Sequence, residues 1–338
     1  MSRKIGQVGL CFVLGACLLA GCGNPAEGLS FGGSVNGSSS FVAAGDKLAY
    51  ARNLENGSVL ELLDRERGAA LQTEYGLYFP YYACGDAVLG RTADDAIGLF
   101  RLEDYKLSTV LRLPADMFLG DYVPLGQTVY YVAGRDGADE LRAYHMDTGK
   151  DTTFLIGEDI SGLWAYDQSI FAYVQASDGA GQLYRFAAGD LEAEGTAEDN
   201  TLTEGVLVHE TEGEWQLDNL FSTPAGLVAA ETDSNGDGRA VWLQSGQIRE
   251  QIQVQAAGGD ALYYFASTTE AGETVTDRQQ VYRMPADGSG GEAVCTLPEP
   301  AVGMQVLEDG TLLIETAGGF YEAAANGTEV VRPLSPAA

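Results

Sequence analysis

Residues 81–91 read YYACGDAVLGR, in which a short apolar run meets a Gly-Asp turn and a second apolar run follows. The same phrase begins at Phe41 (FVAAGDKLAYA), at Tyr122 (YVPLGQTVYYV) and at Leu163 (LWAYDQSIFAY). Weaker copies begin at Leu220, Gln255 and Gln305. Anchored on the turn at residues 45, 85, 126 and 167, the first three steps are 40, 41 and 41 residues long. A period of about 40 residues is typical of β-propeller blades.

Each unit contains four strand-length runs. In the first unit FVAA, KLAYAR, SVLELLDR and AALQTEY are separated by Gly45-Asp46, by Asn56-Gly57 and by a charged turn that ends at Gly68. Asn-Gly and Gly-containing turns supply the positive φ angles that tight hairpins need. One blade alone would bury only one face, so the units must stack into a ring. The sequence therefore predicts an all-β propeller with seven four-stranded blades; six or eight remain open because the later units drift from the register.

Composition favours one globular, turn-rich domain over residues 41–338. The 338-residue chain is 45% hydrophobic, with 44 glycines and 17 tyrosines, and no linker interrupts the repeat. Its formal charge is −30, and removal of Arg3 and Lys4 with a leader would take it to −32. Such a field repels phosphate backbones, so nucleic acid is excluded as a partner. We expect the domain to be monomeric.

The N-terminus predicts export and a lipid anchor. Residues 1–21 carry two basic residues and an apolar stretch that ends in Leu19-Ala20-Gly21, directly before Cys22. This resembles a bacterial lipoprotein signal, with diacylation expected at Cys22. An ordinary secretory signal and an uncleaved anchor are the alternatives. Residues 22–40 are rich in Gly and Ser and predict a flexible tether to the membrane.

A candidate calcium loop begins at Asp233. Asp233, Asn235 and Asp237 place side-chain oxygens at alternate positions, as in loops that hold this hard cation, and Gly238 follows. The loop lacks the glutamate of an EF-hand at the twelfth position, where Gln244 stands, and no flanking helix is expected. Structural calcium and a plain turn are both open interpretations, and no other cofactor is indicated.

Other catalytic signals are scarce. His145 and His209 have no neighbouring ligand pattern, and the carboxylates are too numerous for one pair to stand out as a glycosidase dyad. Cys84 and Cys295 are the cysteines that follow Cys22. They fall on an inner and an outer strand of different units, which favours separate thiols over a disulfide. A G-x-S-x-G match at Ser30 lacks the strand and helix of a nucleophile elbow.

A resemblance follows from the third runs of several units, LFRLED from Leu99, LRAYHMDTG from Leu141, LYRFAAGD from Leu183 and VYRMPADGSG from Val281. Together with the lipobox they resemble uncharacterised extracytoplasmic lipoprotein propellers of Gram-positive bacteria, related in repeat pattern to Tol-type and YWTD-type propellers. The resemblance covers residues 41–334. It implies fold and location, and it carries over no catalytic residue.

These observations predict a lipid-anchored, non-catalytic binding or scaffolding propeller on the outer side of the cytoplasmic membrane. An unknown protein or a cell-wall glycan is the expected partner. The first alternative is a propeller enzyme, a hydrolase or lyase acting on carbohydrate or another substrate through carboxylates in the central channel. It predicts clustered acids with shifted pKa values in a polar pocket. The second alternative is a solute-binding lipoprotein of a transporter, which requires two α/β lobes.

Overall fold

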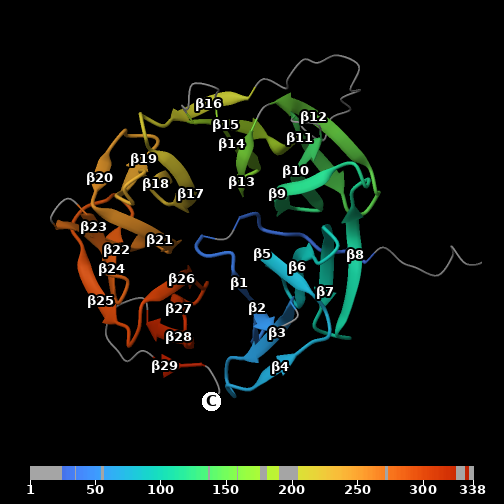
Figure 1. Ribbon diagram of the computed structural model, residues 1–338, viewed down its shortest axis with the longest axis horizontal. Coiled ribbons are helices and arrows are strands. Elements are labelled where there is room, and N and C mark those ends of the chain that lie inside the picture. The colour runs from blue at the N-terminus through green and yellow to red at the C-terminus, as the bar shows by residue number, and fades with distance from the viewer. Residues whose placement is uncertain are drawn as a thin grey trace, which may run out of the picture.

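The computed structural model describes residues 25–34, 36–54, 57–135, 138–157, 159–175, 181–189, 205–270, 273–324 and 332–334. These residues form seven antiparallel sheets arranged as blades around a central channel (Figure 1). The prediction of a seven-bladed all-β propeller is confirmed. Since no α/β lobe occurs among the described residues, the fold does not support the solute-binding alternative.

The strands of each blade follow one another along the chain. Blade 1 consists of β1 (Phe41–Ala44), β2 (Lys47–Leu54), β3 (Gly57–Asp64) and β4 (Ala70–Gln72). Blade 2 consists of β5 (Leu77–Cys84), β6 (Ala87–Thr92), β7 (Ala96–Arg101) and β8 (Lys106–Arg112). Blade 3 consists of β9 (Phe118–Leu125), β10 (Thr128–Arg135), β11 (Ala138–His145) and β12 (Asp151–Gly157). Blade 4 consists of β13 (Ile160–Tyr166), β14 (Ser169–Gln175), β15 (Gly181–Ala187) and β16 (Val206–Glu210).

The last three blades keep this order with one addition. Blade 5 consists of β17 (Gln216–Thr223), β18 (Gly226–Thr232), β19 (Gly238–Trp242) and β20 (Ile248–Glu250). Blade 6 consists of β21 (Ile252–Gly258), β22 (Ala261–Glu270), β24 (Gln280–Pro285) and β25 (Glu292–Thr296), and β23 (Glu273–Thr276) pairs with β22. Blade 7 consists of β26 (Ala301–Val306), β27 (Thr311–Thr316), β28 (Gly319–Ala324) and β29 (Arg332–Pro333). The sequence expansion from Thr268 to Gln280, read as a lengthened hairpin between the two central strands of unit six, corresponds to this β22–β23 pairing.

The repeated phrase forms the same element in every blade. Its turn connects the innermost strand to the second strand, as at Gly45-Asp46 between β1 and β2 and at Gly259-Asp260 between β21 and β22. We call the side of the ring that carries these seven turns the turn face. The innermost strands begin on the opposite side, which we call the mouth face, because neighbouring strands of a blade are antiparallel.

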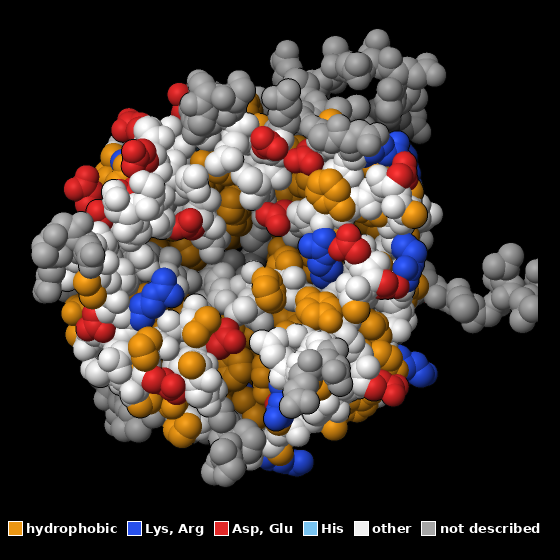
Figure 2. Space-filling view, viewed as in Figure 1, with side chains coloured by type: hydrophobic (Ala, Val, Ile, Leu, Met, Phe, Trp, Pro, Cys, Tyr) orange, Lys and Arg blue, Asp and Glu red, His pale blue; other side chains and the backbone are white. Residues whose placement is uncertain are grey.

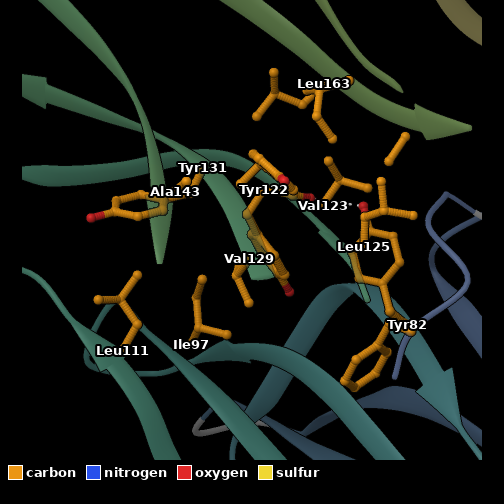
Figure 3. Packing of buried hydrophobic residues seen from close by; sticks show 14 of the residues in the cluster. Tyr82, Ile97, Leu111, Tyr122, Val123, Leu125, Val129, Tyr131, Ala143 and Leu163 are labelled. Carbon is orange, nitrogen blue, oxygen red and sulfur yellow. Dashed lines mark hydrogen bonds between the residues drawn. The ribbon is translucent and has the colours of Figure 1, made fainter. Parts of the chain in front are cut away.

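Apolar clusters lie between consecutive blades. In the largest cluster Tyr82 of β5 packs beside Tyr122 of β9, with ring centroids 5.7 Å apart, and Val129 and Leu163 extend the cluster into blades 3 and 4 (Figure 3). The Tyr82 hydroxyl donates to the Tyr122 carbonyl oxygen at 2.8 Å. Burial of both sheet faces explains why these strands read as near-continuous apolar runs instead of alternating.

Blade 1 and blade 7 close the ring by packing, since in the described part of the chain no blade contains strands from both ends. Phe41 and Leu48 share a buried cluster with Leu313 and Phe320, and the Phe41 and Phe320 rings lie 5.3 Å apart. The closure therefore has an apolar interior, like the other blade interfaces.

The sequence predicts a flexible tether over residues 22–40, whereas the described residues of this stretch are hydrogen-bonded to the blades. These residues, 25–34 and 36–40, cross the centre of the ring, where Figure 1 shows the segment in blue. Ser34 N–H donates to Ala165 O at 3.0 Å, and Phe31 pairs with Gly126 through two backbone hydrogen bonds of 2.9 Å. We call residues 25–40 the channel segment. Small Gly and Ser side chains, which suggested flexibility, also let a backbone approach other backbones closely.

The channel segment continues around the ring to the later blades. The Ala257 N–H of blade 6 donates to Asn36 O at 3.1 Å, and Ser38 N–H donates to Met304 O of blade 7 at 2.6 Å. Ser40 Oγ then donates to Glu315 Oε2 at 2.6 Å. The segment therefore contributes hydrogen bonds across the ring closure before it enters β1. The acidic stretch from Gly189 to Gly205, which the sequence predicts to be an exposed loop inserted in unit four, lies mostly outside the described residues.

Candidate binding site

Two adjoining cavities open in the central channel on the mouth face. The first, of about 330 Å³, is bordered by β5, β9, β13 and β17, and the second, of about 480 Å³, is bordered by β17, β18 and β21. Both are lined by Gly37 of the channel segment and by Asp218 and Asn219 of β17. We call the two together the mouth site. The ring face in Figure 2 shows a central hollow with acidic, basic and hydrophobic side chains around it.

Aromatic side chains form one wall of the first cavity. Phe79 near the start of β5 is 59% exposed, which is unusual for a large apolar side chain. Trp164 of β13 is 9% exposed, and its Nε1 donates to Asn219 Oδ1 at 2.9 Å across the interface between blades 4 and 5. Tyr82 completes the wall. The hollow therefore offers apolar ring surface next to polar groups.

Two aspartates face the same cavity. Asp121 of β9 and Asp218 of β17 come from blades two positions apart in the ring. Both residues are exposed at the hollow, and the surrounding protein removes only part of their hydration. The resulting loss of hydration raises the pKa of Asp121, and the Arg91 guanidinium opposes this shift in part. Desolvation likewise raises the pKa of Asp218, although a hydrogen bond from Thr232 Oγ1 opposes it.

Arg91 is the basic side chain of the first cavity. Its guanidinium is held by Asp95 at 2.6 Å and also donates to the Leu119 carbonyl oxygen. The charge of this guanidinium partly offsets the increase that desolvation causes in the pKa of Asp121. The cavity thus combines hydrogen-bond donors and acceptors in defined positions.

A buried charge network forms the wall of the second cavity. The fully buried Glu231 carboxylate accepts hydrogen bonds from Arg239 Nε at 2.7 Å and from His209 Nε2. The Arg239 guanidinium lies 4.1 Å from the centre of the Trp215 ring. A buried carboxylate needs such partners, because loss of Arg239 would leave an uncompensated charge. Sequence reasoning had found no partner for His209, since Glu231 lies in another strand.

A cavity of about 630 Å³, larger than either mouth cavity, lies on the turn face between blades 1, 6 and 7. Its lining is mostly Gly, Ala and aliphatic residues, and its Arg283 side chain forms ion pairs with Asp260 at 3.0 Å and with Glu292 at 3.4 Å. The aspartates with raised pKa values lie at the mouth site instead. We therefore place the candidate site at the mouth, although its cavities are smaller.

The predicted calcium loop is a turn between β18 and β19. Asp233 Oδ1 accepts hydrogen bonds from the N–H groups of Asn235 at 2.9 Å and Asp237 at 2.8 Å. Thr274 Oγ1 from the long hairpin donates to Asp237 Oδ1. Within the described residues no group of three or more His, Cys, Asp or Glu side chains is arranged to hold a metal ion. Asn235 falls outside that count, so the calcium loop stays a prediction.

The remaining predicted residues lie apart from the mouth site. Cys22, the predicted lipidation site, lies outside the described residues. Cys84 and Cys295 are unpaired, half-buried thiols, as expected from their strands. Burial raises the pKa of Cys295 to about 11. His145 lines a separate cavity between blades 3 and 4.

Sequence reasoning missed the residues of the mouth site. Phe79, Asp121 and Asp218 each lie five or six residues before the turn of their own blade, just outside the quoted phrase. An alignment of the seven units on their turns would have shown acidic and aromatic residues at the start of the inner strands. What alignment could not show is that three different blades bring them to one cavity.

No helix in the described part of the chain is long and apolar enough to cross a membrane. No known family model and no curated protein sequence matches the chain. Solved structures share its fold. An oligogalacturonate lyase from Vibrio parahaemolyticus is 11% identical, with a TM-score of 0.60 over 86% of this chain and 91% of that one. An oligogalacturonate lyase in complex with manganese is 12% identical, with a TM-score of 0.58 over 88% and 96%.

A third similar structure is PorZ, a surface component of the type-IX secretion system of Porphyromonas gingivalis. It is 12% identical, with a TM-score of 0.57 over 92% of this chain and 39% of that one. At these identities the likeness shows the fold alone. The chain is therefore a seven-bladed β-propeller with mostly four-stranded blades, similar in fold to lyases and to a secretion-system surface protein.

Proposed function

We propose that this chain is a non-catalytic binding propeller, anchored outside the cytoplasmic membrane by lipid on Cys22, and that it binds its ligand at the mouth site. The observation that carries the proposal is the exposed Phe79 ring beside the Asp121 and Asp218 carboxyls in one open hollow. Pockets that bind ligands combine apolar walls with a few placed polar groups in this way. The adjoining cavities suit an extended ligand.

The ligand class that fits best is a neutral or amine-bearing glycan of the cell envelope. Asp121 and Asp218 supply acceptors for hydroxyl or amine groups, and Phe79 and Trp164 supply ring surface for the apolar face of a sugar. The chain's formal charge of −30 disfavours polyanionic glycans such as polygalacturonate. The proposal therefore does not extend the substrate of the similar lyases to this chain.

The test is retention of the soluble chain, residues 23–338, on insoluble cell-wall glycan from which anionic polymers have been removed. We expect Phe79→Ala to weaken binding at least tenfold, about 1.4 kcal/mol, while the protein stays folded. Phe118→Ala is the matched control, because Phe118 is 56% exposed at the start of β9 but lines neither mouth cavity. Equal loss in both variants, or no retention of the wild type, would contradict the proposal.

A protein partner is the competing outcome. Crosslinking of the lipidated protein in intact cells, followed by identification of what is captured, distinguishes the two. Recovery of one protein in near-stoichiometric amount, with no retention on glycan, would favour scaffolding over glycan binding.

An enzyme is the second candidate, because Asp121 and Asp218 both have raised pKa values and line one cavity. A carboxyl whose pKa is raised keeps its proton to higher pH, which is what a general acid requires. Prolonged incubation with the retained glycan should release no new reducing ends if the site only binds. Release that disappears in both Asp121→Asn and Asp218→Asn would establish turnover and replace the binding proposal.

A further inference from the structure

The channel segment becomes attached to the ring at its first described residue. Arg101, the last residue of β7, donates to the Pro25 carbonyl oxygen from Nη2 at 2.8 Å and from Nε at 3.3 Å. Ala26 is fully buried within the large apolar cluster, and Leu29 packs against that cluster. The Cys84 thiol donates to the Ser30 carbonyl oxygen at 3.2 Å. Pro25 to Ser30 are thus held by blade 2.

These contacts lie on the turn face. Arg101 pairs with Ala87, which directly follows the turn between β5 and β6, and Cys84 directly precedes that turn. Further along, Phe31 pairs with Gly126 in the corresponding turn of blade 3. The chain therefore enters the ring on the turn face beside blades 2 and 3, and the mouth site lies on the opposite side.

The distance from this entry point to Cys22 is short. Pro25 is the third residue after Cys22, and a fully extended chain spans at most about 11 Å over three residue steps. An eight-residue strand such as β9 spans about 27 Å at 3.4 Å per residue. A lipid on Cys22 therefore cannot extend from the turn face to the mouth face.

We infer that the turn face beside blades 2 and 3 lies against the membrane and that the mouth site faces away from it. The inference rests on the lipid anchor of the proposed function and deepens it. The formal charge of −30 gives the domain no electrostatic attraction to anionic lipids, so the short connection alone sets the orientation. A ligand reaches the mouth from the cell wall or the medium, without competition from bilayer lipids.

The test places one fluorophore at a time on the acylated full-length protein bound to phosphatidylcholine vesicles that carry a nitroxide-headgroup lipid. Asp86→Cys, in the turn between β5 and β6, reports the turn face, and Asp116→Cys, between β8 and β9, reports the mouth face. Both positions are exposed and belong to the same sector of the ring. The background carries Cys84→Ser and Cys295→Ser to remove competing thiols.

We expect several-fold stronger quenching at position 86 than at position 116. Insertion of twelve Gly and Ser residues after Gly23 should reduce the difference, because a flexible linker of about fifteen residues has a root-mean-square reach of roughly 21 Å. Equal quenching at both positions, as an edge-on ring would give, or stronger quenching at 116, would overturn the inference. Mass analysis keeps the two proposals distinguishable, since a chain without lipid on Cys22 would contradict the anchor itself.

Discussion

Asn36 and Ser222 hydrogen-bond to each other in both directions. The Asn36 Nδ2 donates to the Ser222 carbonyl oxygen at 3.2 Å, and the Ser222 N–H donates to Asn36 Oδ1 at 3.0 Å. The Asn36 side chain therefore pairs with the N–H and C=O of Ser222 at the inner edge of β17, as the backbone of a neighbouring strand would. Because the Asn36 carbonyl oxygen also accepts from Ala257 N–H, this residue links blades 5 and 6.

Replacement of Asn36 by alanine should destabilise the ring. The Ser222 N–H and C=O would both lose their partner in a partly buried site, at a cost of about 1–3 kcal/mol. Thermal unfolding should show a melting temperature several degrees lower. Asn53→Ala is the control, because Asn53 accepts only an exposed hydrogen bond from Ser58. Similar melting of both variants would show that the channel segment contributes little to stability.

Gly33 tests the close approach of the channel segment to blade 4. It has φ +95°, and a Cβ atom there would lie 2.4 Å from the Ala165 carbonyl oxygen. Gly28 also has a positive φ, +77°, but nothing lies within 4 Å of its Cβ position. Gly33→Ala should therefore lower the melting temperature clearly more than Gly28→Ala, since only Gly33 adds a steric clash to the backbone strain. The reverse order would contradict the described path of the segment.

Asp121 predicts a pH dependence of stability. Although the residue is exposed at the hollow, partial loss of hydration raises its pKa in the folded state, so the folded protein holds this proton more tightly than the unfolded chain. The carboxyl then costs no stability below its ordinary pKa, and the cost develops as pH rises through the raised folded-state pKa. We expect Asp121→Asn to melt higher than wild type at pH 7 and equally at pH 3, measured by circular dichroism.

Asp94 serves as a control because its pKa is shifted in the opposite direction, downward. Hydrogen bonds from Thr92 and Arg112 lower its pKa, so its carboxylate stabilises the fold above its ordinary pKa and loses that effect as pH falls through the lowered value. Asp94→Asn should therefore melt lower than wild type at pH 7. If Asp121→Asn also melts lower at pH 7, ionised Asp121 is stabilised by the site and its described environment is wrong.

The calcium loop has a direct thermodynamic test. An ion bound only by the folded state at a concentration a hundredfold above its Kd adds about 2.7 kcal/mol to stability. Millimolar calcium should raise the melting temperature of the wild type and leave Asp237→Ala unchanged, because Asp237 is one of the three predicted ligands. Identical wild-type melting with calcium and with chelator would leave residues 233–238 as a hydrogen-bonded turn.

The fold could be predicted from the sequence because each blade repeats one local pattern. The seven turns predicted from the phrase all join the first and second strands of their blades. They include the turns at Pro224 and Asp309, which belong to the weak copies that begin at Leu220 and Gln305. Hairpin turns and apolar runs depend on residues close in sequence, so one chain suffices to read them. The drift in the later units reflects longer loops and not missing blades.

The path of residues 25–40 and the mouth site could not be predicted in this way. Gly and Ser residues predict flexibility when the chain is considered alone, whereas Gly33 and Ser34 are fixed by the backbone of blade 4, far along the sequence. Asp121 and Asp218 likewise line one cavity because the ring brings blades 3 and 5 around a common centre. The carboxylates of an acidic chain look equivalent until the fold shows which of them lose hydration.

Carboxyl footprinting tests the mouth site most directly. The soluble chain, residues 23–338, is treated with carbodiimide and an amine, with and without solubilised cell-wall glycan, and modification of each acidic residue is followed by mass spectrometry. Bound glycan should reduce modification of Asp121 and Asp218 and leave Asp86 on the turn face unchanged. Unchanged modification of both mouth aspartates under conditions of saturating glycan, or protection confined to the turn face, would contradict binding at the mouth site.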